Sequence, residues 1–209
     1  MTPYYQDDLV TIYHGDALAV LPELPQSDLL LTDPPYNVGV NYGQHNDRQD
    51  PDAYAAWCRL WFAASMAITK RQIVFPGHGN LPIWWQWRKP SAVGCWYKPG
   101  NPASSHLGWS EWEPYLYWGT RVGGRDVVRA TVSEQSDTGD HPCPKPLTLF
   151  RALIEKFKPA SILDPFLGSG TSLYAAKWFG VPAIGIEIEE RYCEIAAQRC
   201  SQEVLGLVG

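Results

Sequence analysis

Short apolar runs alternate with amphipathic segments along most of this chain. The runs are typical of buried strands and end at turn residues, whereas apolar positions three and four apart indicate helices. The expected strands are 10–13, 28–32, 72–75, 93–97, 114–118, 162–163 and 183–188, and the expected helices are 17–24, 53–69, 80–88, 146–157, 171–179 and 189–205. This alternation predicts an α/β fold with a doubly wound, mostly parallel sheet of Rossmann-like type and helices on both faces.

Length and composition favour a single domain over 1–209. The chain has 209 residues, of which 45% are hydrophobic, and no apolar run approaches the ~20 residues that span a bilayer. Met1 to Asp8 lacks the basic and apolar regions of a signal peptide, so we expect a cytoplasmic protein without a membrane partner. Five cysteines without a C-x-x-C pair argue against a disulfide framework and against a metal site.

A stiff turn, Asp33-Pro34-Pro35-Tyr36, directly follows the apolar residues 29–31. Asp33 and Pro34 each precede a proline, which favours extended backbone and holds the Asp33 carboxylate and the Pro34 carbonyl at a fixed separation. Two such acceptors suit an amino group on an aromatic base, because they localise the nitrogen lone pair that the ring otherwise delocalises. Tyr36 offers a flat ring on which an extruded base can stack. Asp33, Pro34, Pro35 and Tyr36 are therefore the predicted catalytic residues of amino-group methylation.

A second strand-to-turn motif runs from Asp164 to Thr171, with the sequence DPFLGSGT. Glycines between a strand and a helix allow close backbone approach to a ligand. Leu173 occupies the third glycine position of a dinucleotide fingerprint, and the sequence holds no G-x-x-x-x-G-K loop. Glu187 follows Gly168 by 19 residues, close to the ~20-residue spacing at which a carboxylate meets ribose hydroxyls. The motif predicts a ribose-bearing cofactor without a long phosphate tail.

Several segments share one order with a known family. They are Gly15-Asp16, Asp33 to Asn37, His141-Pro142-x-Pro144-Lys145-Pro146, Asp164 to Thr171 and Gly185-Ile186-Glu187. In this order the chain resembles the S-adenosylmethionine-dependent DNA amino-methyltransferases of the permuted beta group, whose catalytic turn precedes the cofactor turn. The resemblance implies that Phe166, Gly168, Gly170 and Thr171 surround the methionine part of the cofactor. It also implies that Glu187 binds the ribose, that Asp16 lies near the adenine, that Lys145 helps to close the pocket, and that Asp164 and Ser169 belong to the same site.

The middle third of the chain is basic, whereas both ends are acidic. Residues 1–69 carry a net charge of −7, residues 70–158 carry +5, and residues 159–209 carry −3. A basic middle third can neutralise phosphates, although a solvated surface explains any single one of these residues equally well. The candidate DNA contacts are Asn37, Arg48, Arg121, Arg125 and Arg129.

The recognition segment is short compared with the family pattern, because only about 100–140 separates the catalytic half from the cofactor half. We expect either a short target site or contacts borrowed from the loop 37–52, from a second subunit or from a partner. This interpretation allows two protein partners: a second copy of the chain, which would form a homodimer, and a cognate restriction endonuclease.

Three functions follow from these motifs. Adenine N6 methylation is preferred, because Asp at the first position of the catalytic turn resembles the adenine enzymes, whereas cytosine N4 enzymes more often carry Ser there. Cytosine N4 methylation is the first alternative. The second alternative is a catalytically silent nucleic-acid-binding protein on a methyltransferase scaffold, which the intact Asp33 and Gly168 motifs disfavour.

Overall fold

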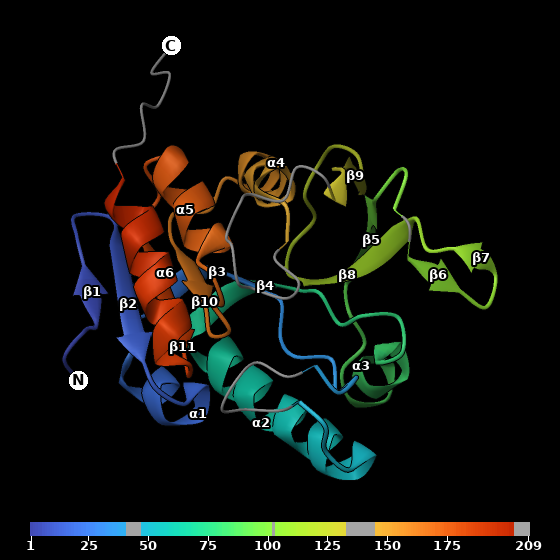
Figure 1. Cartoon of the computed structure of the whole chain (residues 1–209), viewed down its shortest axis with the longest axis horizontal. Helices are drawn as coiled ribbons and strands as arrows, with labels where there is room; N and C mark the ends of the chain where they lie inside the picture. The colour runs from blue at the N-terminus through green and yellow to red at the C-terminus, as the bar shows by residue number, and fades with distance from the viewer. Residues whose placement is uncertain (41–46, 102, 133–144, 203–209) are drawn as a thin grey trace.

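A mixed sheet forms the centre of the fold in the computed structural model, which describes residues 1–40, 47–101, 103–132 and 145–202. Within these ranges the sheet has nine strands in the order β1-β2-β11-β10-β3-β4-β8-β5-β9 (Figure 1). In this order the strands are Tyr5–Gln6, Val10–His14, Ala183–Glu187, Ile162–Asp164, Ser27–Thr32, Thr69–Val74, Trp112–Trp118, Ala92–Tyr97 and Val127–Arg129. Strands β1 and β8 run against the other seven described strands, which confirms the mostly parallel sheet.

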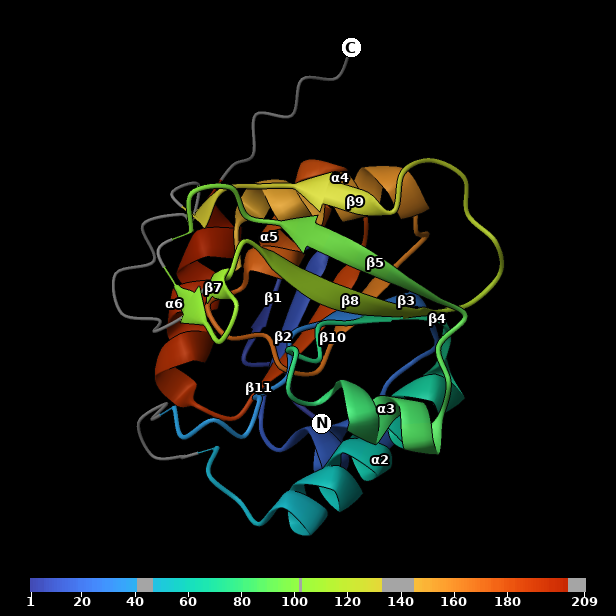
Figure 2. The same cartoon turned by 90° about the vertical axis from the view of Figure 1, so that its right-hand side faces the viewer.

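Helices cover both faces of the sheet, as expected for a doubly wound fold. They are α1 (Ala17–Val20), the 3₁₀ turn Leu21–Glu23, α2 (Pro51–Ile68), α3 (Leu81–Trp87), α4 (Leu147–Phe157), α5 (Thr171–Trp178) and α6 (Glu190–Ser201). Figure 2 shows α4 and α5 above the sheet and α2 and α3 below it. Successive β3 side chains alternate between the two cores: Leu29 and Leu31 pack with α4, α5 and α6, and Leu30 packs with α1, α2 and α3.

The expected elements are confirmed with small differences at their ends. Helix α2 begins at Pro51 rather than Ala53, because the Asp50 carboxylate caps the free N–H groups of Asp52 and Ala53 and proline suits the first helical position. The expected C-terminal helix is described to Ser201, and residues 203–205 lie outside the described ranges. Among the described helices, none combines the length and apolarity needed to cross a bilayer.

Three short elements were not expected. They are β1, β9 and a two-stranded hairpin of β6 (Ser104–Ser105) and β7 (Gly108–Trp109), which projects beyond the ends of β5 and β8 (Figure 1). Each spans two or three residues, too few for an alternating pattern to stand out in the sequence.

The strand order positions the two turn motifs. Strand β10 pairs in parallel with β3, with Ile162 opposite Leu29, and also with β11, with Asp164 opposite Gly185. The carboxyl ends of β3, β10 and β11 therefore lie side by side at one edge of the sheet. α/β folds bind their ligands in the crevice at the carboxyl ends of such neighbouring strands.

Candidate active site

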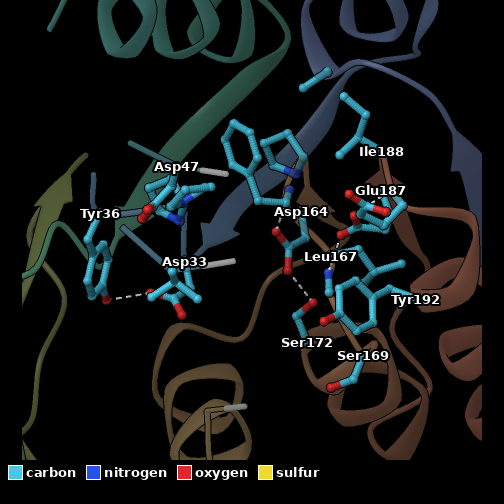
Figure 3. A pocket seen from close by; sticks show the side chains of 18 of the residues that line it. Asp33, Tyr36, Asp47, Asp164, Leu167, Ser169, Ser172, Glu187, Ile188 and Tyr192 are labelled. Atoms are coloured by element: carbon cyan, nitrogen blue, oxygen red, sulfur yellow. Dashed lines mark hydrogen bonds between the residues drawn. The ribbon is translucent and has the colours of Figure 1, made fainter. Parts of the chain in front are cut away.

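A cavity of about 470 Å³ lies at this edge, within the range typical of small-molecule sites. Both predicted turns line it. The predicted residues on its wall are Asp16, Asp33, Pro34, Pro35, Tyr36, Lys145, Asp164, Phe166, Gly168, Ser169, Thr171 and Glu187. Figure 3 shows Asp33 and Tyr36 on one side of the cavity and Glu187 and Tyr192 on the other.

Asp164 joins the two turns. Its Oδ1 accepts a hydrogen bond from Thr32 Oγ1, on the catalytic strand, at 2.7 Å, and its Oδ2 accepts one from Ser172 Oγ at 2.5 Å. The Phe166 N–H also donates to Oδ1, at 3.1 Å. Burial raises the pKa of Asp164 to about 6, although these donors oppose the shift. A single carboxyl group thus fixes the spacing between the catalytic and glycine-rich turns.

The Asp33–Tyr36 turn is held by residues that the sequence did not single out. The Tyr54 hydroxyl donates to the Pro35 carbonyl at 2.7 Å, and Asn80 Nδ2 donates to the Tyr36 carbonyl at 2.9 Å. Gly77 has φ +67°, and a Cβ added there would lie 3.0 Å from the Tyr36 ring. Glycine therefore permits the close approach that supports one face of this ring.

Asp33 and Tyr36 belong to a buried charge network. Lys145 Nζ lies 2.7 Å from Asp33 Oδ2 and 2.9 Å from the Tyr36 hydroxyl, which lies 2.5 Å from Asp33 Oδ1. Glu113, on β8, adds a second carboxylate: its Oε1 lies 2.5 Å from the Tyr36 hydroxyl, and its Oε2 lies 3.3 Å from Lys98 Nζ. Sequence inspection missed Glu113, because nothing in its local pattern distinguishes it from a solvated strand residue.

The network shifts the pKa values of Asp33 and Glu113 in opposite directions. Burial raises the pKa of Asp33, aided by the Glu113 charge and opposed by Lys145. Burial alone would lower the pKa of Lys145, but the carboxylates of Asp33 and Glu113 outweigh it and raise this pKa. For Glu113, burial acts upward, and Lys145, Tyr36 and Lys98 together bring its pKa below the ordinary value. The network therefore raises the pKa of Asp33 and lowers that of Glu113.

The opposite wall offers a carboxylate held by the backbone. Glu187 Oε2 accepts from the Gly168 N–H at 2.7 Å, and Oε1 accepts from the Glu189 N–H at 2.9 Å. Gly168 and Gly170 both have positive φ angles, 53° and 83°, which favour glycine. Phe166 contacts Trp61 edge to face, with ring centroids 4.9 Å apart. This wall combines the Phe166 ring with the fixed carboxylate of Glu187, which suits a ligand that carries a sugar hydroxyl pair.

The remaining predicted residues occupy several places. Asp16 accepts from the Leu18 N–H at 2.8 Å, so it caps α1 at the rim of the cavity. The Asn37 amide exchanges two hydrogen bonds with the Gln49 backbone, so it joins two described segments beside the cavity, and Arg48 precedes Gln49. His141, Pro142 and Pro144 lie outside the described residues.

The three candidate arginines do not lie together. Arg129 ends β9 opposite Tyr97, at the carboxyl end of β5 and hence at the cavity edge of the sheet. Arg121 lines a separate hollow with Ser91 and Ala92, where β5 begins. The Arg125 carbonyl contacts Lys156, in the last turn of α4.

Among the described residues, no group of three or more His, Cys, Asp or Glu side chains could hold a metal ion. The cavity instead presents a basic carboxylate and an aromatic ring on one wall and a glycine-rich turn on the other. This arrangement can hold a planar amino-bearing group against a second ligand.

Comparison with known proteins agrees with this geometry. A family model described as DNA methylase, N6_N4_Mtase, matches residues 84–198, more than half of the chain. Type II methyltransferase M.ScaI of Streptomyces caespitosus is 26% identical, covering 98% of this chain and 86% of that protein. DNA adenine methyltransferase YhdJ of Escherichia coli K12 is 28% identical, covering 93% of this chain and 84% of that protein.

Two solved structures show the same fold. PvuII DNA methyltransferase, described as cytosine-N4-specific, has a TM-score of 0.76 at 17% identity and covers 96% of this chain and 89% of its own. The complex of M1.HpyAVI with SAM has a TM-score of 0.71 at 21% identity and covers 93% of this chain and 100% of its own.

Proposed function

This chain belongs to the N6_N4_Mtase family of DNA methylases, and from that membership we propose that it methylates the exocyclic amino group of adenine N6 in DNA, with S-adenosylmethionine as the methyl donor. The observation that carries the proposal is the single cavity lined by both the Asp33 turn and the Gly168 turn. The adenine preference rests on Asp33 at the first position of the catalytic turn. The adenine methyltransferase among the relatives also supports it.

The residues of the cavity fit the cofactor. Gly168 lines the cavity and allows close backbone approach, Phe166 supplies an apolar wall, and Glu187 offers a carboxylate to ribose hydroxyls. Gly170, which was also expected at the cofactor, faces Ala196 of α6 and supports the turn from behind. Asp16, Ser169 and Thr171 complete this side of the site. When bound, S-adenosylmethionine would supply a methyl group that its sulfonium already activates, and it would leave as the neutral thioether. The chain positions the acceptor amine, which gives up one proton in the transfer.

The catalytic turn provides that positioning. Asp33 and the Pro34 carbonyl accept hydrogen bonds from the amino group and localise the nitrogen lone pair, while the Tyr36 ring supports the extruded base. Lys145 holds the Asp33 carboxylate in place. Of the candidate arginines at 121, 125 and 129, Arg129 ends its strand on the cavity side of the sheet.

Cytosine N4 is the second candidate target, and the fold shared with PvuII DNA methyltransferase is the observation that favours it. Incubation with unmethylated DNA and methyl-labelled cofactor, followed by nucleoside chromatography, separates the candidates. We expect label in N6-methyladenine. Label in N4-methylcytosine selects the second candidate, and unlabelled DNA with intact cofactor binding selects a silent scaffold. Purification of the chain from its host tests the expected homodimer and restriction endonuclease.

A further inference from the structure

One hydroxyl group lies between two carboxylates in this site. The Tyr36 hydroxyl oxygen is 2.5 Å from Asp33 Oδ1 and 2.5 Å from Glu113 Oε1. It carries a single hydrogen, so it donates to one carboxylate at a time. Lys145 Nζ donates to the same oxygen at 2.9 Å and therefore does not compete for that hydrogen.

The groups around this pair set its charge. Asp33 faces Lys145, Tyr36, Glu113 and, across the cavity, Asp164; Glu113 faces Lys145, Lys98, Tyr36 and His78. Two ammonium groups thus balance the buried Glu113 and the half-buried Asp33, which allows both carboxylates to remain ionised. Glu113 is 7% exposed, so its charge is poorly screened and acts strongly on Asp33.

The direction of the Tyr36 hydrogen decides how well Asp33 accepts. When the hydrogen points to Asp33, it occupies a lone pair and makes the carboxylate less basic. When it points to Glu113, Asp33 Oδ1 has a free lone pair, which can accept a hydrogen bond from an incoming amino group. Without Glu113, a hydroxyl turned away from Asp33 would be left without an acceptor, so its hydrogen would stay on Asp33.

We propose that Glu113 is a positioning residue for methyl transfer, which takes the Tyr36 hydroxyl hydrogen and so frees Asp33 to accept the amino group of the target base. The inference rests on the proposed function, because the amino group is its ligand. Glu113 acts in two ways: it offers the alternative acceptor, and its negative charge keeps Asp33 basic. Nothing in the proposal requires Glu113 to touch the base or the cofactor.

Glu113→Gln keeps the shape of the side chain and removes its charge. We expect the single-turnover methylation rate to fall roughly tenfold or more, while the cofactor dissociation constant changes less than about twofold. The acidic limb of the pH–rate profile should shift to lower pH, because the charge that raises the pKa of Asp33 is gone. Glu155→Gln, on the exposed face of α4, is the matched control and should behave as wild type.

A double-mutant cycle with Tyr36→Phe tests the path of the effect. Phenylalanine keeps the ring and removes the hydroxyl, so the rate loss caused by Glu113→Gln should be much smaller in that background. Equal losses in both backgrounds would show that Glu113 acts without the Tyr36 hydroxyl and would overturn the proposal.

A measurement without DNA or cofactor separates this inference from the proposed function. The carboxyl carbon of Asp33, assigned in ¹³C spectra with Asp33→Asn, should titrate at lower pH in Glu113→Gln than in wild type. If Asp33 titrates at lower pH in Glu113→Gln while the wild-type protein methylates no DNA, the coupling of Glu113 to Asp33 is supported and the proposed function is rejected. An unshifted titration together with wild-type methylation by Glu113→Gln would reject the inference alone.

Discussion

At the scale of single residues, the site depends on a carboxylate that the fold holds through an ion pair. Asp33 is 2.7 Å from Lys145, whose side chain is only 9% exposed, so the ammonium group depends on nearby carboxylates for its charge balance. Removing Asp33 leaves Glu113, at 3.3 Å, as a partner of Lys145. The network should therefore survive the loss of Asp33 even though the chemistry does not.

Asp33→Ala should lower the single-turnover methylation rate by about 10²–10⁴-fold, because the amino nitrogen loses the acceptor that localises its lone pair. Cofactor affinity, measured by calorimetry, should stay within roughly threefold, because Glu187 and the Gly168 turn lie on the other wall. Asp8→Ala, at an exposed position near the N-terminus, provides the control. Turnover close to wild type in Asp33→Ala would remove Asp33 from the mechanism.

Asp164 should make stability depend on pH in an unusual direction. Its pKa is about 6 in the fold against an ordinary 3.8, so the folded state binds the proton more tightly. The resulting stabilisation is present below about pH 4 and is lost as the pH rises through about 6. Relative to Asp164→Asn, the unfolding free energy of wild type should fall by roughly 3 kcal/mol over this range. Urea denaturation of both proteins at several pH values measures it, and parallel curves would contradict the raised pKa.

At the scale of elements, the start of α5 depends on a glycine that faces another helix. Gly170 caps α5 with φ +83°, and a Cβ there would lie 2.8 Å from the Ala196 Cβ of α6. Gly180, after the same helix, has φ +65°, but a Cβ added there would meet no atom within 4 Å. The two glycines thus share backbone strain and differ in packing.

Gly170→Ala should destabilise the protein by about 1–3 kcal/mol more than Gly180→Ala, because only the first adds a steric clash to the left-handed strain. Chemical denaturation of both variants gives the difference. Gly170→Ala should also weaken cofactor binding, since the clash displaces the turn that lines the cavity. Equal destabilisation by the two substitutions would show that α5 and α6 separate without cost.

How much of this fold could be predicted depended on the length of each pattern. The strand before Asp33 and the long helices repeat their pattern over several residues, and they were expected at nearly the observed bounds. The short strand before Asp164 was placed by the turn motif that follows it. Both turns could be identified because proline restricts the local backbone and glycine permits the positive φ angles that a turn needs. Glu113, Tyr54 and Asn80 reach the site only through the pairing of β4 with β8 and the packing of α2 and α3, which no local pattern encodes.

At the scale of the whole molecule, the sheet separates basic residues that the sequence alone does not distinguish. Arg129 lies opposite Tyr97, one residue before Lys98, whose ammonium group pairs with Glu113 in the network around Asp33. Arg121 lies where β5 begins, beside Ser91. A duplex that delivers a base to the cavity therefore passes close to Arg129 and far from Arg121.

The salt dependence of DNA binding should distinguish Arg129 from Arg121. Each phosphate contact that is lost lowers the slope of log K against log salt concentration by about one. We expect Arg129→Ala to reduce the slope by roughly that amount and Arg121→Ala to leave it unchanged. Fluorescence anisotropy with a labelled duplex, titrated at several salt concentrations, measures both variants against wild type. The opposite ranking would mean that the duplex approaches from the amino end of β5, where the cavity residues Asp33 and Tyr36 could not receive an extruded base.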